Sequence, residues 1–352
     1  MNRECRIVTT GLALWSLAAL AACGPDSSGK NRPTESATPT FWQLPPEFTH
    51  TVSATLTFTA SPDVSPTPTP PAVPEAAPAG TPIAAGWNHT CAITGEGGVM
   101  CWGNNGDGQL GDGSRTARTK PVSVKNFTGR AVAVTTGWGY TCILTDAGGV
   151  KCWGRNKNGE LGNGTTQRSS EPVDVTGLTG GVVAIAAGDS HTCAVTAQGG
   201  LKCWGYNNAG QLGDGSTETR TEPVEVAGLE GVTAVAAGTA HTCARTAGGE
   251  VLCWGNNEQG QLGDGSDAAS RGKPEPVRGL TGGITALTAK GGHTCVLSGS
   301  VQIQCWGVNK YGQLGDGTFE NRSAPTPVTA LEGSISSIAA GWGQTCAVLD
   351  GG

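Results

Sequence analysis

Short alternations of apolar and polar residues, separated by glycine-rich turns, run through residues 81–352 of the chain. Segments such as Val132-Ala133-Val134 have the period of two that is typical of half-buried β-strands. Each is followed by a Thr-Cys segment, a glycine-rich turn, a segment ending in Cys-Trp-Gly, and a Pro-Val-x-Val segment such as Pro172 to Val175. Four short segments joined by turns predict one four-stranded antiparallel sheet.

The four segments recur at a nearly constant spacing. The first cysteines of successive units are residues 91, 142, 193, 243, 295 and 346, which are 51, 51, 50, 52 and 51 residues apart. Periods near 50 indicate a propeller or an array of repeats. We therefore expect an all-β fold, a β-propeller of four-stranded antiparallel blades. The expected repeats are five full units at about 83–130, 131–181, 182–231, 232–283 and 284–334, and the start of a sixth at 335–352.

The amino terminus has a different pattern. Arg3 and Arg6 precede an apolar run over residues 7–22 that is short for a membrane span but suits a signal peptide. The run ends in Leu20-Ala21-Ala22-Cys23, which resembles the lipobox of bacterial lipoproteins. The resemblance implies that residues 1–23 are a lipoprotein signal and that Cys23 is lipidated, so that the chain is extracytoplasmic and anchored to a bacterial membrane. An ordinary secretory signal with an incidental cysteine is the alternative.

Residues 24–80 are rich in proline, threonine, serine and alanine and poor in aliphatic side chains. Such a segment cannot bury enough apolar surface to offset its chain entropy, so we expect a disordered spacer. The whole chain has a formal net charge of −6 and only 14% charged residues. Because nucleic-acid phosphates require a basic face, this composition argues against a nucleic-acid partner.

The repeats resemble a known family. The string Gly-x-x-His-Thr-x-Ala-x-Thr-x-x-Gly-x-Val-x-x-Trp-Gly-x-Asn-x-x-Gly-Gln-Leu-Gly-x-Gly is similar to the repeat of the regulator of chromosome condensation family. The resemblance covers about residues 81–352 and implies a β-propeller, commonly of seven blades. This chain departs from the family in carrying a cysteine pair in every complete hairpin, and in having five full units with the opening of a sixth. We interpret it as a truncated six- or seven-bladed ring.

A symmetric hairpin register pairs the cysteines. In the hairpin centred on Glu96, Cys91 lies opposite Cys101 and Ile93 lies opposite Val99. Opposed residues sit ~4.5 to 5.5 Å apart at Cβ, within disulfide reach. Export makes oxidised cysteines the expected state. We therefore predict five disulfide rungs, buried between blades: Cys91–Cys101, Cys142–Cys152, Cys193–Cys203, Cys243–Cys253 and Cys295–Cys305.

The register gives Cys346 a partner position of 356, which lies beyond Gly352. We expect Cys346 to keep its thiol, and we interpret the sequence as a fragment that lacks the rest of blade six and possibly a seventh. A native open arc, or two chains bridged through Cys346, is the alternative.

A metal site is the competing interpretation of the cysteines. His89, His191, His241 and His293 each precede the first cysteine of a unit by two residues and could share its face of the strand. Zinc ligands, however, gather four at one point, whereas these pairs are spread one per blade. Tyr140 and Gln344 take the histidine position in repeats two and six, so we interpret the histidine as structural and expect no metal or other cofactor.

The loops after Cys-Trp-Gly carry acidic residues beside glycines: Asp112, Asp214, Asp264 and Asp316, with Asn163 in the second repeat. Carboxylates in such loops suggest calcium, but the ligand order of an EF-hand and its terminal glutamate are absent. Turn formation is the favoured interpretation. The tryptophans of the Cys-Trp-Gly segments are interpreted as packing between blades: Trp102, Trp153, Trp204, Trp254 and Trp306.

Three further tryptophans, Trp87, Trp138 and Trp342, each follow a glycine just before a Thr-Cys segment. Their surroundings resemble the Gly-Trp-Arg-His-Thr segments of light-sensing plant members of the family, which would imply a photoreceptive cluster. The arginine is missing from all three segments, and the tryptophan position holds Asp189, Thr239 and Gly291 in repeats three to five. We therefore predict a binding patch of exposed tryptophans on one rim.

The sequence has no Gly-x-Ser-x-Gly segment, no phosphate loop and no carboxylate pair set apart from the repeats. We expect a protein that is not an enzyme: a membrane-anchored binding or scaffold protein whose disulfide-stapled propeller recognises a protein or a glycan. An inhibitor of a secreted enzyme, a role found in the family, and a structural envelope protein are the alternatives. Nucleotide exchange on a small nuclear GTPase, which the family name suggests, does not fit an exported chain.

Overall fold

The structure is a computed structural model of the whole chain, and it describes residues 82–280 and 283–350. The predicted signal at 1–23, with Cys23, and the predicted spacer at 24–80 lie outside the described residues. Within the described ranges, the structure contains no helix with the length and apolar character needed to cross a membrane.

In the described part of the chain, the backbone forms six antiparallel sheets, five of four strands and one of two. The first sheet contains β1 (Ile83–Ala85), β2 (His89–Ile93), β3 (Val99–Gly103) and β4 (Arg118–Ser123). The second contains β5 (Ala131–Thr136), β6 (Tyr140–Thr145), β7 (Val150–Gly154) and β8 (Ser169–Asp174). The third contains β9 (Val182–Ala187), β10 (His191–Thr196), β11 (Leu201–Gly205) and β12 (Arg220–Glu225). The fourth contains β13 (Val232–Ala237), β14 (His241–Thr246), β15 (Val251–Asn256) and β16 (Ser270–Pro276). The fifth contains β17 (Ile284–Lys290), β18 (His293–Ser298), β19 (Gln302–Gly307) and β20 (Arg322–Pro327), and the sixth contains β21 (Ile335–Ala340) and β22 (Thr345–Leu349).

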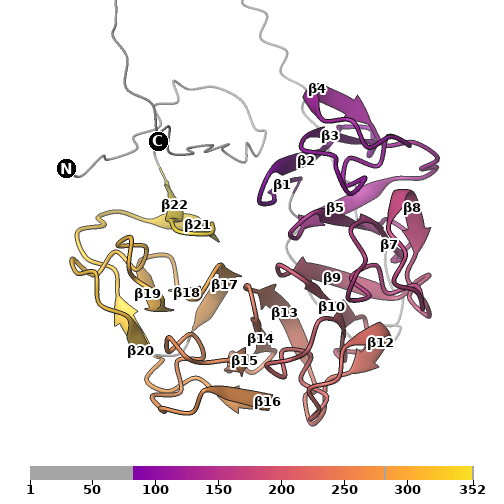
Figure 1. Cartoon of the computed structure of the whole chain (residues 1–352). Helices are drawn as coiled ribbons and strands as arrows, with labels where there is room; N and C mark the ends of the chain where they lie inside the picture. Colours follow the sequence, from indigo (N-terminus) through magenta and orange to yellow (C-terminus); the bar gives the residue numbers. More distant parts are fainter. Residues whose placement is uncertain (1–81, 281–282, 351–352) are drawn as a thin grey trace, which may run out of the picture. The chain divides into compact units, whose positions relative to one another are not determined.

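The sheets follow one another around a common axis, with the first strand of each sheet innermost (Figure 1). Each first strand contacts the first strand of the next sheet, in the order β1, β5, β9, β13, β17 and β21. Strands in each sheet pair in sequence order. The prediction of an all-β propeller built from antiparallel blades is therefore confirmed.

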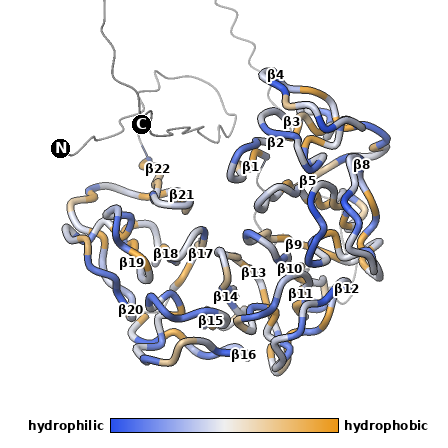
Figure 2. The backbone as a smooth tube through the Cα atoms, viewed as in Figure 1, coloured by the Kyte–Doolittle hydropathy of each residue, from blue (hydrophilic) through white to orange (hydrophobic). Residues whose placement is uncertain are grey.

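The central hairpin of each blade has the predicted register. In the first sheet Cys91 pairs with Cys101, Ala92 with Met100 and Ile93 with Val99. Gly97 closes this hairpin with a φ of 86°, a backbone conformation that glycine adopts without a steric penalty. Polar turns and apolar strand positions alternate along the backbone in every blade (Figure 2).

Each of the five predicted cysteine pairs is bridged by a disulfide, with the two Cα atoms 4.1 Å apart. All ten of these cysteines are fully buried. The first pair packs in a cluster with Leu110 of its own sheet and Trp153 of the next, so the bridge lies at an interface between blades. Cys346 lies on β22, is exposed, and stands apart from these five bridges.

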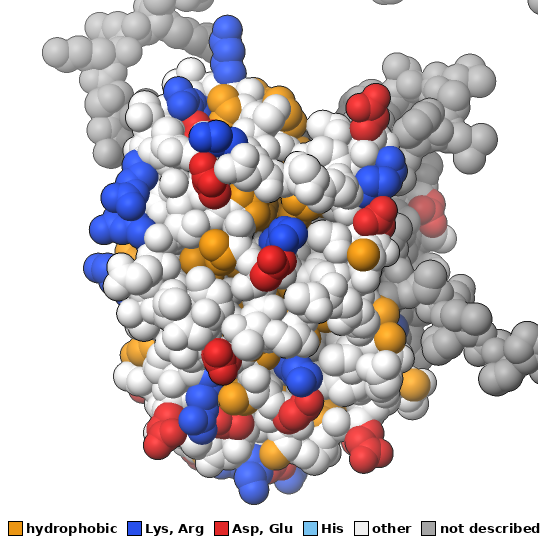
Figure 3. Space-filling view, turned by 90° about the vertical axis from the view of Figure 1, so that its right-hand side faces the viewer, with side chains coloured by type: hydrophobic (Ala, Val, Ile, Leu, Met, Phe, Trp, Pro, Cys, Tyr) orange, Lys and Arg blue, Asp and Glu red, His pale blue; other side chains and the backbone are white. Residues whose placement is uncertain are grey.

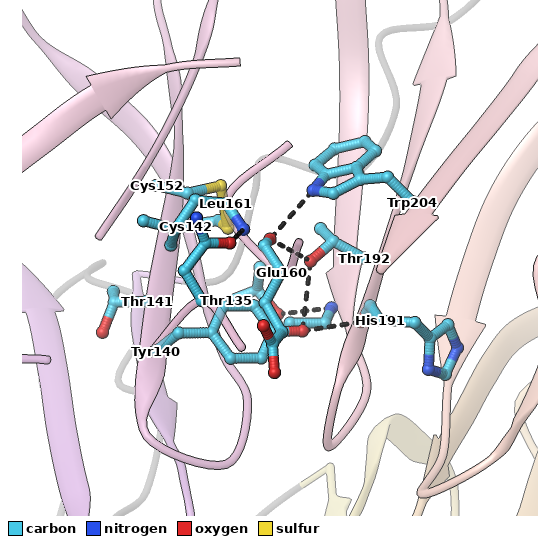
Figure 4. Close-up of a disulfide and its surroundings, with 12 residues drawn as sticks. Thr135, Tyr140, Thr141, Cys142, Cys152, Glu160, Leu161, His191, Thr192 and Trp204 are labelled. Carbon is cyan, nitrogen blue, oxygen red and sulfur yellow. Dashed lines mark hydrogen bonds between the residues drawn. A yellow bond between two sulfur atoms is a disulfide. The ribbon is translucent and has the colours of Figure 1, made fainter. Parts of the chain in front are cut away.

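Tryptophans of the Cys-Trp-Gly segments connect neighbouring blades. Trp204 is fully buried, and its indole N–H donates a hydrogen bond of 2.9 Å to the carbonyl of Glu160 in the preceding blade (Figure 4). Three more tryptophans repeat the arrangement: Trp153, Trp254 and Trp306. The predicted packing role is confirmed for these four, whereas Trp102 of the first sheet is only half-buried.

The outer side of the propeller carries lysine, arginine, aspartate and glutamate side chains interspersed among neutral polar ones (Figure 3). Several of them form pairs between adjacent strands, such as Lys202 with Glu225 at 3.0 Å. Mixed charges of this kind suit a solvated face.

Candidate binding site at the axial loops

The loops that join the first and second strands of the sheets meet at one end of the axis. We call them the axial loops: residues 86–88, 137–139, 188–190, 238–240, 291–292 and 341–344. Backbone hydrogen bonds connect successive loops, including Trp138 N–H to the Asp189 carbonyl at 2.9 Å and Thr239 N–H to the Gly291 carbonyl at 2.8 Å. These hydrogen bonds connect the second, third, fourth and fifth loops into one surface.

Glycine begins most of these loops because there is no room for a side chain. A Cβ atom at Gly137 would lie 1.9 Å from a ring carbon of Tyr140 and 2.6 Å from the carbonyl oxygen of Gly188. A Cβ at Gly238 would lie 2.1 Å from the ring of His241 and 2.9 Å from the carbonyl oxygen of Gly291. Close approach of neighbouring loops thus requires glycine at this repeat position.

The three tryptophans that the sequence assigned to a rim all lie in axial loops. Trp87, Trp138 and Trp342 are 51%, 42% and 44% exposed. Trp87 and Trp342 come from the first and sixth sheets, yet their ring centroids are 5.1 Å apart in an edge-to-face arrangement. Tyr311, from the loop between β19 and β20, lies 6.2 Å from Trp342. We refer to Trp87, Trp138, Tyr311 and Trp342 as the aromatic rim.

Cationic side chains flank the aromatic rim. The guanidinium of Arg155 lies 4.1 Å from the ring centroid of Trp138, and the amine of Lys310 lies 4.7 Å from the centroid of Tyr311. Both contacts are within the range of cation–π attraction. Sequence analysis missed Arg155, Lys310 and Tyr311. Their signal is weak, because they occupy variable positions of the repeat loops, and Lys310 and Tyr311 meet Trp342 across two sheets.

Lys290 interrupts the glycine pattern at the start of the axial loops. It stands at the position that holds Gly86, Gly137, Gly188, Gly238 and Gly341 in the other units. Its half-buried side chain crosses the axis, and its amine donates hydrogen bonds to the carbonyls of Thr136 at 2.8 Å and Ala187 at 3.2 Å. Burial lowers the pKa of Lys290, and the nearby charge of Asp189 opposes that shift. An amine of the fifth blade thereby connects the second and third blades.

The repeat histidines are buried between blades. The Nε2 of each hydrogen-bonds to a threonine hydroxyl of the following blade, as His191 does with Thr242 at 2.9 Å. The other three pairs are His89 with Thr141, His241 with Thr294 and His293 with Thr345. Burial lowers the pKa of His191 and His241 to about 3 and the pKa of His89 and His293 to about 4. At neutral pH these rings are therefore uncharged parts of the blade interfaces.

In the second blade, tyrosine takes the place of the histidine. The hydroxyl of Tyr140 donates to the carbonyl of His191 at 2.6 Å and accepts a hydrogen bond from Thr192 at 3.1 Å (Figure 4). The same contact between blades is made by a different side chain, which supports the structural interpretation of the histidine position.

The acidic loops are held by internal hydrogen bonds. Asp112 accepts from the Ser114 hydroxyl at 2.7 Å, from Asn105 at 3.1 Å and from Arg118 at 2.9 Å. Burial raises the pKa of Asp112, but the hydrogen bonds from Ser114, Arg118 and Asn105 outweigh burial and bring the pKa to about 2. Asp214 and Asp316 have equivalent serine or threonine, asparagine and arginine partners. The carboxylates thus stabilise the conformation of their own loops.

Across residues 82–280 and 283–350, no group of three or more His, Cys, Asp or Glu side chains is placed to hold a metal ion. The axial loops instead combine exposed aromatic rings, flanking cations and a lysine at the axis. Such a surface suits the docking of another molecule, because large aromatic and arginine side chains contribute strongly to binding interfaces.

Comparison with protein families gives two matching models, both described as the regulator of chromosome condensation (RCC1) repeat. One matches residues 147–195, 198–245, 248–297 and 302–348. The other matches residues 83–109, 131–160, 182–211 and 232–261. Together they cover the first three strands of the first blade, the other four complete blades and most of the described part of the sixth.

Among curated proteins, the chain is similar to the ultraviolet-B receptor UVR8 of Arabidopsis thaliana, with 38% identity over 277 residues. The match covers 77% of this chain and 63% of the receptor, so the chain spans less than two thirds of that relative. Among solved structures, human WBSCR16 superposes with a TM-score of 0.68 and 26% identity, over 76% of this chain and 71% of that one. Prp20p of Saccharomyces cerevisiae, whose structure was described with its binding to Gsp1p and histones, gives a TM-score of 0.68 at 25% identity, over 76% of this chain and 69% of Prp20p.

Proposed function

The chain belongs to the regulator of chromosome condensation repeat family, and from this premise we propose that its propeller binds a protein partner through the aromatic rim. We further propose that it does so outside the cytoplasm, where a lipid on Cys23 anchors the chain to a bacterial membrane. The observation that carries the binding role is the gathering of three exposed tryptophans and Tyr311, from four different loops, at one end of the axis. Elsewhere the tryptophans of four blades are fully buried.

The aromatic rim has the features of an interface core. Tryptophan, tyrosine and arginine are the side chains most often found as energetic centres of protein interfaces. Here exposed indole and phenol rings contact one another, and Arg155 and Lys310 lie beside them. A partner that covers the rings removes apolar surface from water, which contributes roughly 25 cal/mol for each Å² of apolar surface.

Family relatives support a protein as the ligand. Prp20p is described with binding to Gsp1p and histones. We do not carry those partners over to this chain, which we place outside the cytoplasm. Nor do we extend the light response of the ultraviolet-B receptor to it, because Asp189, Thr239 and Gly291 replace tryptophan in three of the six axial loops.

One feature of the sequence and one of the structure support the extracytoplasmic, anchored location. The segment Leu20-Ala21-Ala22-Cys23 has the form of a lipobox, and each complete blade contains a cysteine pair in disulfide geometry. Stable disulfides of this number are expected in oxidising compartments and are rare in the bacterial cytoplasm. Intact mass of the membrane-purified protein, before and after reduction and alkylation, tests this part. We expect a diacylglyceryl-modified chain that begins at Cys23 and ten cysteines that become alkylated only after reduction, whereas thiols at those ten positions before reduction would contradict it.

A capture experiment tests the binding role. The tagged full-length protein, its Trp87→Ser/Trp342→Ser variant and a Val301→Ser control are used to capture partners from envelope extracts. Val301 is 68% exposed and lies in the turn between β18 and β19, at the opposite end of the hairpin from the axial loops. We expect the wild type and the control to capture the same protein and the double variant to lose it. Equal capture by all three would overturn the assignment of the rim.

A further inference from the structure

Among the described units, only the fifth has a residue other than glycine just before its axial loop, and this residue is Lys290. The fifth blade accommodates it because β17 is one residue longer than β13 and runs to Lys290, which pairs with His293. The next residue, Gly291, has a φ of 55° and takes the place of the rim tryptophan. A change in two successive repeat positions thus brings an amine to the axis and replaces the adjoining rim tryptophan with a glycine.

The amine of Lys290 lies at the base of the second and third axial loops. Its two acceptors, the carbonyls of Thr136 and Ala187, belong to the residues just before the axial loops that contain Trp138 and Asp189. On the other side, the backbone of Gly291 approaches that of Trp342 so closely that a Cβ at Gly291 would lie 2.3 Å from the Trp342 carbonyl oxygen. The amine thus lies at the base of the loop that carries Trp138, and the backbone next to Lys290 contacts the loop that carries Trp342.

The positive charge of Lys290 is not neutralised by an ion pair. Among the salt bridges of the described residues, none includes Lys290. The charged group that acts on it is the nearby carboxylate of Asp189, and the charge of Lys290 in turn lowers the pKa of His89 and His191. A lysine ammonium has three N–H donors, and the two carbonyls accept two of them. A half-buried cation with this arrangement is suited to a carboxylate ligand, because charge-assisted hydrogen bonds are stronger than those to neutral carbonyls.

We propose that the axial site binds an acidic side chain of the partner protein, with the carboxylate at the amine of Lys290 and the flanking apolar residues of the partner against the aromatic rim. This inference rests on the proposed function and specifies the chemistry of its ligand. It assigns Asp189 an opposing role, since its negative charge competes with the carboxylate of the ligand. Lys310, which lies beside Trp342, supplies further positive charge at the aromatic rim, whereas the charge of Arg155 is paired with Glu160.

The probe is a pair of peptides, acetyl-Gly-Leu-Glu-Leu-Gly-amide and the same peptide with Gln in place of Glu, titrated into the full-length protein. Tryptophan fluorescence reports binding, since the peptides contain no aromatic residue. We expect the Glu peptide to bind about tenfold more tightly than the Gln peptide, and this ratio to decrease with added salt. Binding of neither peptide up to ~10 mM, or equal binding of both, would overturn the proposal.

Three variants test whether Lys290 causes the preference for the Glu peptide over the Gln peptide. Lys290→Met is expected to reduce the Glu to Gln ratio to near one, and Lys202→Met, which removes a lysine paired with Glu225 on the outer part of the third blade, to leave it unchanged. Asp189→Asn removes the competing charge and is expected to raise the ratio two- to threefold. This gain of affinity keeps the proposal testable even where Lys290→Met fails to fold. If the Lys290 variant only lowers the melting temperature and keeps the ratio, Lys290 is a structural tie across the axis and the proposal is wrong.

The capture experiment separates this inference from the proposed function. If the Trp87→Ser/Trp342→Ser variant loses the partner while Lys290→Met keeps both the partner and the peptide ratio, the aromatic rim remains the binding surface and the carboxylate site is refuted. If the double tryptophan variant keeps the partner, the proposed function itself has failed.

Discussion

The interfaces between blades and the axial loops use the same repeat in opposite ways. At the interfaces each of the five complete units places a disulfide and a hydrogen-bonding histidine or tyrosine at equivalent positions, and four of them add a fully buried tryptophan. At the axial loops the units diverge: three carry tryptophan, the others carry Asp189, Thr239 and Gly291, and one replaces glycine with Lys290. The equivalent positions stabilise the fold, whereas the divergent positions expose different side chains to solvent. This difference is what directs the functional assignment to the axis.

The largest expected effect comes from removing the disulfides. Each closes a loop of about 11 residues and contributes about 2.8 kcal/mol in the chain-entropy account, so the five together contribute up to about 14 kcal/mol. This is comparable with the whole stability of an ordinary domain. We expect reduction at neutral pH to unfold the blades, as followed by circular dichroism at increasing dithiothreitol. A folded protein with ten alkylated cysteines would show that packing alone keeps the blades folded.

Acid tests the histidine interfaces. The pKa of the four histidines is about 3 to 4 in the folded state and 6.5 in the reference state, so protons bind preferentially to the unfolded chain. Their contribution to stability is complete above pH 6.5 and is lost as the pH falls toward 4. Each histidine contributes a slope of about 1.36 kcal/mol per pH unit, or about 5.4 kcal/mol per unit for four. Urea unfolding at several pH values between 7.5 and 4.5 measures this slope.

A histidine variant provides the control for the acid experiment. Gln344 occupies the histidine position in the sixth sheet, so His241→Gln introduces a side chain that the repeat already uses. We expect the slope of the free energy of unfolding against pH to fall by about one quarter. An unchanged slope would mean that His241 is protonated in the folded protein.

Matched tryptophan substitutions compare the two regions directly. Trp204→Ala removes a fully buried ring and the hydrogen bond to Glu160, and we expect a loss of about 3–5 kcal/mol in the free energy of unfolding. Trp87→Ala removes a ring that is 51% exposed, and we expect a change within about 0.5 kcal/mol. Denaturant unfolding of both variants measures the difference. Similar losses would place the rim tryptophans among the structural residues.

Much of the fold could be predicted because the repeat is local. Cys91 and Cys101 belong to one hairpin, so a symmetric register is enough to pair them, and the glycine-rich turns mark the strand ends. The position of Trp138 in an axial loop also follows from the repeat.

Contacts across blades could not be predicted in the same way. Tyr311 approaches Trp342 from a different sheet, and Lys290 reaches carbonyls 154 and 103 residues away in sequence. Such contacts depend on how the sheets close around the axis. Lys290 nevertheless leaves a visible signal, since it breaks a pattern of glycines whose side-chain space is occupied by neighbouring loops.

Photo-crosslinking from inside the axial loops tests the central claim most directly. A benzophenone amino acid is placed at Trp138 or, as the control, at Val301, and the full-length protein is irradiated in intact cells. Both positions are exposed, and they lie at opposite ends of the blades. We predict a discrete crosslinked protein from position 138 and none from position 301. The same product from both positions, or a product from position 301 alone, would contradict the assignment of the axial loops as the binding surface.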